Sequence, residues 1–131
     1  MGAVLLDTSV IIDCLRGRPM TSQRLLRLKA GEDDAYICAV SAEEVTRGIR
    51  PGEEDALIRL LDGILQAPLG ISEGRLAGFW KRTFAKQGRT ISQSDALVAA
   101  AAAGVNARLA TGNPKDFPMR GLTVEHWPVG E

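Results

Sequence analysis

Short apolar runs alternate with helical segments along the whole chain, and no hairpin turn joins one run to the next. Four runs are typical of buried strands: 3–6, 35–40, 107–110 and 122–125. The segments between them have the apolar spacing or the capping residues of helices, over 10–15, 21–30, 41–48, 53–65, 73–87 and 92–103. This order predicts one α/β domain over residues 1–131, with a parallel central sheet flanked by helices. Residues 67–71 form either a connector or a short edge strand, so the sheet has four or five strands.

The composition suits a packed core of aliphatic side chains. The chain is 45% hydrophobic but only 5% aromatic, so Leu, Ile, Val and Ala must fill the interior. Cys14 and Cys38 lie in apolar runs and are expected to be buried, reduced thiols. The N-terminal segment lacks the layout of a signal peptide, and the longest apolar run, 96–105, is too short to cross a bilayer. We therefore expect a cytoplasmic protein that does not associate with membranes.

The 16 basic and 16 acidic residues give a formal net charge of zero. The field of the whole protein therefore does not attract nucleic acid, and any RNA or DNA must bind to a local basic surface. Arg47 and Arg50 lie close to Glu44, and 81–89 contains further Lys and Arg residues. Each cluster either contacts a nucleic-acid backbone or forms a solvated charged face.

Four acidic residues share one local setting, at the end of a predicted strand or near the start of a predicted helix. They are Asp7, Glu44, Asp95 and Asp116. In an open parallel sheet, ligands bind beyond the carboxyl ends of the strands. Asp7, Glu44 and Asp116 follow three different predicted strands, which brings them to that edge. Asp95 precedes the third strand, so its convergence depends on where its helix begins.

A cluster of carboxylates would be stabilised by a bound cation. Hard oxygen ligands without clustered His or Cys indicate Mg²⁺ or Mn²⁺. Such an ion acts as a Lewis acid and lowers the pKa of a water molecule, and phosphodiester hydrolysis needs both effects. The pattern therefore predicts a metal-dependent nuclease. The single histidine, His126, does not fit a general-base scheme.

Helix capping is the structural alternative for each acid taken singly. Ser41-x-x-Glu44 and Ser92-x-x-Asp95 both fit the capping box, in which the acid accepts a hydrogen bond from the cap's own N–H. Asp116 fits the third position of a helix that begins with Asn113 as cap and Pro at the first position. Asp7 fits an N-cap. Capping does not explain the residues around the acids, which follow a wider pattern.

The segments around the four acids resemble the PIN-domain ribonucleases, and specifically the VapC toxins of toxin–antitoxin pairs. Residues 5–12 match an apolar strand followed by Asp-Thr-Ser, and 41–48 have a Glu four residues before a Gly. Residues 91–100 have an Asp that opens an Ala-rich helix, and 109–117 read Thr-x-Asn-x-x-Asp-Phe. Each motif is short, but the four stand in the same order as in the family and span nearly the whole chain.

The resemblance implies an endoribonuclease that depends on Mg²⁺ or Mn²⁺. Asp7 and Asp95 would be the central metal ligands, and Glu44 and Asp116 would complete the acidic site directly or through water. The side chains expected to support the carboxylates are those of Thr8, Ser9, Thr111 and Asn113. Many relatives have Asp where this chain has Asn113, so Asp116 is expected to take that role here.

The resemblance also implies three partners: an RNA substrate, a second copy of the chain in a homodimer, and a VapB-type antitoxin that blocks the acidic site. Two other functions stay open from the residues alone. The first is a nuclease of this fold that processes RNA or acts on DNA without an antitoxin. The second is a non-catalytic protein-interaction module whose acids are helix caps. A haloacid-dehalogenase-like phosphatase is disfavoured because Ser9 stands where its second Asp would be.

Overall fold

The computed structural model describes residues 2–31 and 33–130 and contains a five-stranded sheet, in which every pairing is parallel. The strand order is β3-β2-β1-β4-β5, so β1 lies at the centre between β2 and β4. The strands are β1 (Ala3–Leu6), β2 (Asp34–Cys38), β3 (Leu65–Ala67), β4 (Arg108–Thr111) and β5 (Val124–His126). The prediction of a parallel α/β fold is confirmed, and the number of strands is five.

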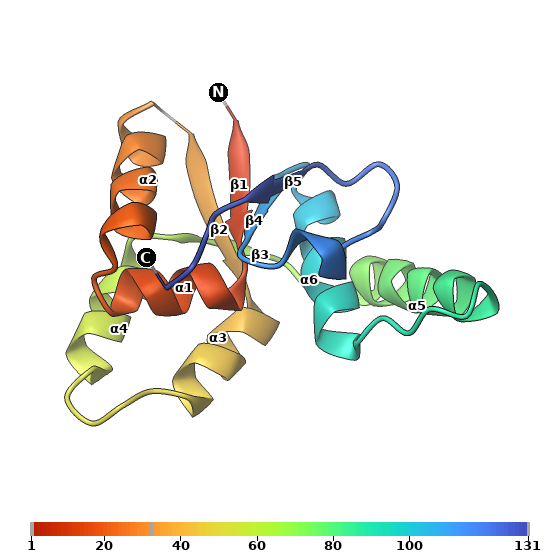
Figure 1. Ribbon diagram of the computed structural model, residues 1–131, viewed down its shortest axis with the longest axis horizontal. Coiled ribbons are helices and arrows are strands. Elements are labelled where there is room, and N and C mark those ends of the chain that lie inside the picture. The colour runs from red at the N-terminus through yellow and green to blue at the C-terminus, as the bar shows by residue number, and fades with distance from the viewer. Residues whose placement is uncertain (1, 32, 131) are drawn as a thin grey trace.

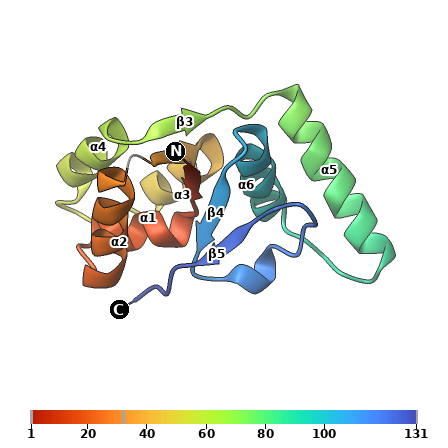
Figure 2. The same ribbon diagram turned by 90° about the horizontal axis from the view of Figure 1, so that it is seen from above.

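Helices cover both faces of this sheet (Figures 1 and 2). They are α1 (Thr8–Leu15), α2 (Pro19–Ala30), α3 (Ala39–Arg47), α4 (Glu54–Asp62), α5 (Ile71–Lys86), α6 (Gln93–Gly104) and the short 3₁₀ turn η1 (Pro114–Asp116). Seen from above, α1, α2 and α4 lie on one side of the central strands, and α5 and α6 lie on the other (Figure 2).

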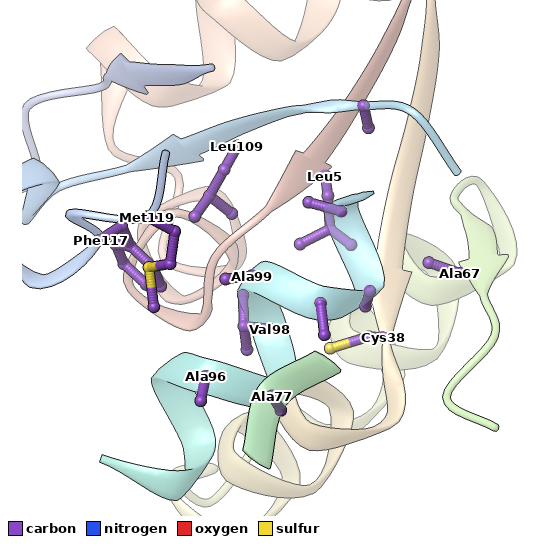
Figure 3. Close-up of a cluster of buried hydrophobic side chains, with 14 of the residues drawn as sticks. Leu5, Cys38, Ala67, Ala77, Ala96, Val98, Ala99, Leu109, Phe117 and Met119 are labelled. Carbon is purple, nitrogen blue, oxygen red and sulfur yellow. The ribbon is translucent and has the colours of Figure 1, made fainter. Parts of the chain in front are cut away.

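The side chains of β1 divide the core in two because successive residues of a strand point to opposite faces. Val4 and Leu6 pack with Val10 and Ile11 of α1 in one cluster. Leu5 packs in the other cluster, against the alanines of α6 (Figure 3). All five of these side chains have no exposed surface. The central strand is thus buried on both faces, which explains its continuous apolar sequence.

The buried residues of helix α6 are nearly all small. Its buried face is formed by Ala96, Val98, Ala99, Ala100, Ala101 and Ala102. They belong to one buried cluster with Leu5 and Leu109, and Figure 3 shows Phe117 and Met119 at one side of it. The aliphatic core predicted from the composition is therefore confirmed.

Several predicted boundaries were wrong. The second strand was predicted over 35–40, but β2 ends at Cys38 and α3 begins at Ala39. Ser41 is therefore a fully buried residue inside α3 and not its N-cap. The helix predicted over 53–65 ends at Asp62 because Gly63 follows, and the next residues form β3.

The other differences are smaller. The edge strand β3 precedes the predicted segment 67–71 and shares only its first residue. Helix α5 has Gly70 and not Ser72 as its N-cap, and the Gly70 N–H donates to the Glu73 carboxylate over 2.8 Å. Strand β5 begins two residues later than predicted. Cys38 is buried and Cys14 is partly buried, and both are free thiols, as expected.

Candidate active site

Asp7 lies where β1 ends and α1 begins, at the carboxyl edge of the sheet. Its Oδ1 accepts a hydrogen bond from the Thr8 N–H over 2.8 Å, which makes Asp7 the N-cap of α1. Its Oδ2 accepts a second hydrogen bond from the Thr111 hydroxyl over 2.7 Å. Asp7 is only 9% exposed. A cap on the helix surface needs neither this burial nor a donor 104 residues away, so its position serves more than capping.

Glu44 lies on α3 and faces the same edge. The Thr8 hydroxyl donates to its Oε1 over 2.7 Å, and the hydroxyl of the buried Ser41 lies 3.1 Å from that of Thr8. The capping-box alternative for Glu44 is wrong because Ser41 is not a cap and Glu44 lies in the second half of the helix. A hydrogen bond from the residue next to Asp7 holds this carboxylate toward the start of α1 instead.

Asp95 lies in the first turn of α6. The N-cap of this helix is Ser92, whose hydroxyl accepts a hydrogen bond from the Asp95 N–H over 3.1 Å. The predicted cap at Ser92 is therefore confirmed. The start of α6 lies at the same edge of the sheet as the starts of α1 and α3 (Figure 1).

Asp116 ends the 3₁₀ turn that follows β4, and its side chain is exposed. The loop between β4 and this turn is fixed by two hydrogen bonds. The Asn113 N–H donates to the Thr111 hydroxyl over 3.0 Å, and the Gly112 N–H donates to the Ser9 hydroxyl over 3.3 Å. The Asn113 side chain makes no capping hydrogen bond to the turn. Thr8 and Thr111 thus donate to the carboxylates of Glu44 and Asp7, whereas Ser9 accepts from the loop that leads to Asp116.

Burial and the charges of neighbouring acids raise the pKa of two of the four carboxyl groups. Burial raises the pKa of Asp7, the hydrogen bonds from Thr111 and Thr8 lower it, and the charges of Glu44 and Asp116 raise it further. Burial also raises the pKa of Asp95, the Ser92 hydroxyl opposes the change, and the charges of Asp7, Asp116 and Glu44 add to it. The site therefore has an excess of negative charge.

A metal site is not fully formed in this arrangement. Among residues 2–31 and 33–130, no three His, Cys, Asp or Glu side chains converge closely enough to hold a metal ion. The chemistry of the donors does fit Mg²⁺ or Mn²⁺, since they are all oxygen atoms and carry excess negative charge. Asp7 and Glu44 are held by hydrogen bonds. The carboxylates of Asp95 and Asp116 are less buried than that of Asp7.

The segment before the C-terminus supports this edge in a way that the sequence did not reveal. The Gly130 N–H donates to the carboxylate of the buried Asp13 on α1 over 2.6 Å. Gly112 lies against Val129, and a Cβ on Gly112 would come within 2.7 Å of that side chain. The loop that follows β4 therefore packs against this segment, and Gly112 is needed for the close approach. In the sequence, the only sign of this contact was Gly112 in the segment 109–117.

The fold and the acidic edge define a class of protein. A family model described as "PIN domain" matches residues 4–118. The chain is 30% identical over 115 residues to a protein named Ribonuclease VapC19 from Mycobacterium tuberculosis, with 88% of this chain and 92% of that protein covered. It is 32% identical over 117 residues to Ribonuclease VapC10 from the same species, with 88% of this chain and 86% of that protein covered.

Solved structures agree with this class. A VapBC2 structure from Rickettsia felis, bound to a DNA fragment from the promoter, matches with a TM-score of 0.85 and 21% identity, and covers 95% of this chain and 98% of that one. VapBC-1 from nontypeable Haemophilus influenzae matches with a TM-score of 0.81 and 26% identity, at the same coverage. The chain therefore belongs to the PIN-domain family, among its VapC members. No helix in the described part of the chain has the length and apolar character to cross a membrane.

Replacing Thr111 by Val should destabilise the protein and change its pH dependence. Thr111 is fully buried, donates to Asp7 and accepts from the Asn113 N–H. Val has the same shape but leaves both partners without this hydroxyl. The free energy of unfolding should therefore fall by about 1–3 kcal/mol. The pKa of Asp7 should rise further, since Thr111 is a cause that lowers it. Urea unfolding measures the loss, and Thr123→Val at an exposed position is the control; equal stability of the two variants would contradict the role of Thr111.

Asp95→Asn should stabilise the metal-free protein at pH 7 more than at pH 4. The pKa of Asp95 is raised above its ordinary value of 3.8, so the folded state binds the proton more tightly than the unfolded state. Stability contributed by this group is present below pH 3.8 and is lost as the pH rises through the folded pKa. Because the carboxyl is partly exposed, we expect a gain of at most about 1 kcal/mol. Thermal unfolding at both pH values tests this expectation. A gain that does not depend on pH, or that Asp34→Asn at an exposed position reproduces, would contradict it.

Proposed function

We propose that this protein is an endoribonuclease that depends on Mg²⁺ or Mn²⁺ and acts as the toxin of a type II toxin–antitoxin pair. The observation that carries the proposal is the gathering of Asp7, Glu44, Asp95 and Asp116 at the carboxyl edge of a PIN-domain sheet, where burial and the charges of neighbouring acids raise the pKa of Asp7 and Asp95. The names of the relatives, Ribonuclease VapC19 and VapC10, support RNA as the substrate.

Asp7 and Asp95 would hold the metal ion, and Glu44 and Asp116 would bind it directly or through water. A divalent ion supplies positive charge to the phosphoryl oxygens and lowers the pKa of a water molecule. The chain's own hydroxyl groups keep the carboxylates in place: Thr111 orients Asp7, and Thr8 orients Glu44. Such fixed orientation reduces the reorganisation needed when charge develops on the phosphate.

A VapB-type antitoxin and a second copy of the chain are the proposed partners. The similar structures from Rickettsia felis and Haemophilus influenzae are of VapBC proteins, which supports an antitoxin. Among residues 2–31 and 33–130, six large apolar side chains are exposed, and partners could cover them: Met20, Leu26, Ile58, Leu65, Ile71 and Phe79. The cytoplasm stays the predicted location, and RNA stays the predicted substrate.

Cleavage assays with the purified chain, free of antitoxin, test the function. A mixture of cellular RNAs is incubated with Mg²⁺ or Mn²⁺, with excess EDTA, and with EDTA followed by excess metal. We expect discrete cleavage products with metal, none with EDTA, and recovery when metal is added back. Cleavage that persists in EDTA would contradict the metal dependence. Cleavage of DNA in place of RNA would favour a nuclease with another role, and folded protein that neither cleaves nor binds metal would favour the non-catalytic module.

A further inference from the structure

A cavity of about 540 Å³ lies between α3 and α6, directly beside the acidic site. Val40, Glu43, Glu44 and Arg47 line it from α3, and Gln93 and Leu97 line it from α6. The residues from each helix are three or four positions apart, so they lie on one face of that helix. The cavity therefore has two continuous walls, one from each helix.

The cavity is continuous with the acidic site because Glu44 belongs to both. Glu44 accepts the hydrogen bond from Thr8 beside Asp7 and also lines the cavity. On the opposite wall, Ser94 lines the cavity and Asp95 follows it in the chain. A phosphodiester at the acidic site would thus place a neighbouring nucleotide at the mouth of the cavity.

The walls combine apolar and polar groups in the way that ligand pockets do. Val40 and Leu97 are partly buried and contribute apolar surface from the α3 wall and the α6 wall. Gln93 is exposed at the start of α6, and its amide carries both donors and acceptors. These groups match a nucleobase, which has apolar faces and a hydrogen-bonding edge.

Arg47 supplies positive charge near an acidic edge that would otherwise repel a nucleic acid. Its guanidinium forms a two-point hydrogen bond to Glu43, at 2.8 Å and 2.9 Å, and both side chains are largely exposed. An exposed ion pair of this kind is weak, because water competes for both partners. Arg47 can therefore leave Glu43 and bind a phosphate at little cost in free energy.

We propose that this cavity is a nucleotide subsite, which holds the base next to the scissile phosphate between Val40 and Leu97. Gln93 reads the edge of that base, and Arg47 binds a flanking phosphate. The inference rests on the proposed ribonuclease function and adds a determinant of sequence preference. A protein partner in the same cavity is the competing occupant, and the test distinguishes the two.

Cleavage of a random-sequence RNA library, with the cut sites sequenced, tests the role of Gln93. Wild type should prefer particular bases on one side of the cut, and Gln93→Ala should reduce that preference about tenfold, since a hydrogen-bonded base edge gives discrimination of that order. Gln23→Ala, at an exposed position on α2, is the matched control. Mn²⁺ affinity should not change in Gln93→Ala. An unaltered base preference in this variant would overturn the assignment of Gln93.

Binding of a labelled RNA hexamer in EDTA tests the subsite independently of catalysis. Arg47→Ala should weaken binding about tenfold and lower its salt dependence, because one phosphate contact is lost. Arg59→Ala, exposed on α4, should match wild type. Equal binding by wild type and Arg47→Ala would overturn the subsite and leave the cavity to a protein partner. A wild type that binds the hexamer through Arg47 but cleaves nothing would overturn the proposed function and retain the subsite.

Discussion

Replacing Asp95 by Asn should reduce RNA cleavage about 10³-fold or more and leave the protein at least as stable as wild type. The proposed metal site loses a charged ligand, and a divalent ion contributes several kcal/mol to the stabilisation of such a transition state. Stability does not fall because burial and three neighbouring acids already oppose the charged form of this carboxyl. The N-cap of α6 is also kept, since it uses the backbone N–H of residue 95 and the Ser92 hydroxyl.

The opposite directions of the two effects make this prediction specific. Substitution of a residue that only caps a helix would lower the free energy of unfolding. Cleavage would then fall only as far as the folded population falls. Cleavage rates under single-turnover conditions and urea unfolding of the same preparation measure both quantities, with Asp34→Asn as the matched control. An Asp95→Asn protein that cleaves RNA at the wild-type rate would remove Asp95 from the site. One that is clearly less stable would show a structural role.

The largest loss of stability is expected from Leu109→Ala, at about 2–5 kcal/mol in the free energy of unfolding. Leu109 is fully buried in β4, which pairs with the central strand β1, and packs against the alanines of α6 (Figure 3). Because those neighbours are small and held by the helix backbone, they cannot move into the space left by the missing atoms. The resulting cavity adds to the lost burial of the side chain.

This variant should also reduce cleavage, because Leu109 lies two residues before Thr111 and faces the helix that carries Asp95. Urea unfolding measures the stability, and Leu26→Ala is the matched control, since Leu26 is 68% exposed and should change by less than about 0.5 kcal/mol. A loss below about 1 kcal/mol for Leu109→Ala would mean that the core relaxes around the change. The close packing of α6 would then not be what fixes the position of Asp95.

The sequence was most informative where one physical rule dominates. Buried parallel strands have short, continuous apolar sequences, so the bounds of β1 and β4 were predicted to within one residue. The position of Asp7 followed directly, since the residue after a central strand must lie at the carboxyl edge. The position of Asp95 did not follow from periodicity, because α6 is apolar on most of its surface and has little amphipathic pattern. Its cap at Ser92 was the useful signal.

The failures came from local signals that tertiary contacts override. Ser41 has the sequence of a helix cap, but the helix begins two residues earlier and Ser41 is buried beside Thr8. The link between Thr8 and Glu44 spans 36 residues, and the one between Thr111 and Asp7 spans 104, so neither could be read from a local motif. The contact of Gly130 with Asp13 is of the same kind.

Titration of Mn²⁺ into the metal-free protein tests the central claim most directly, namely that the four acids form one metal site. Calorimetry on wild type, Asp7→Asn, Asp95→Asn and the control Asp34→Asn gives the affinity for each. We expect both site variants to bind Mn²⁺ at least about tenfold more weakly than wild type and the control. Equal affinity in all four proteins, with the site variants changed only in stability, would contradict the account and make these carboxylates structural.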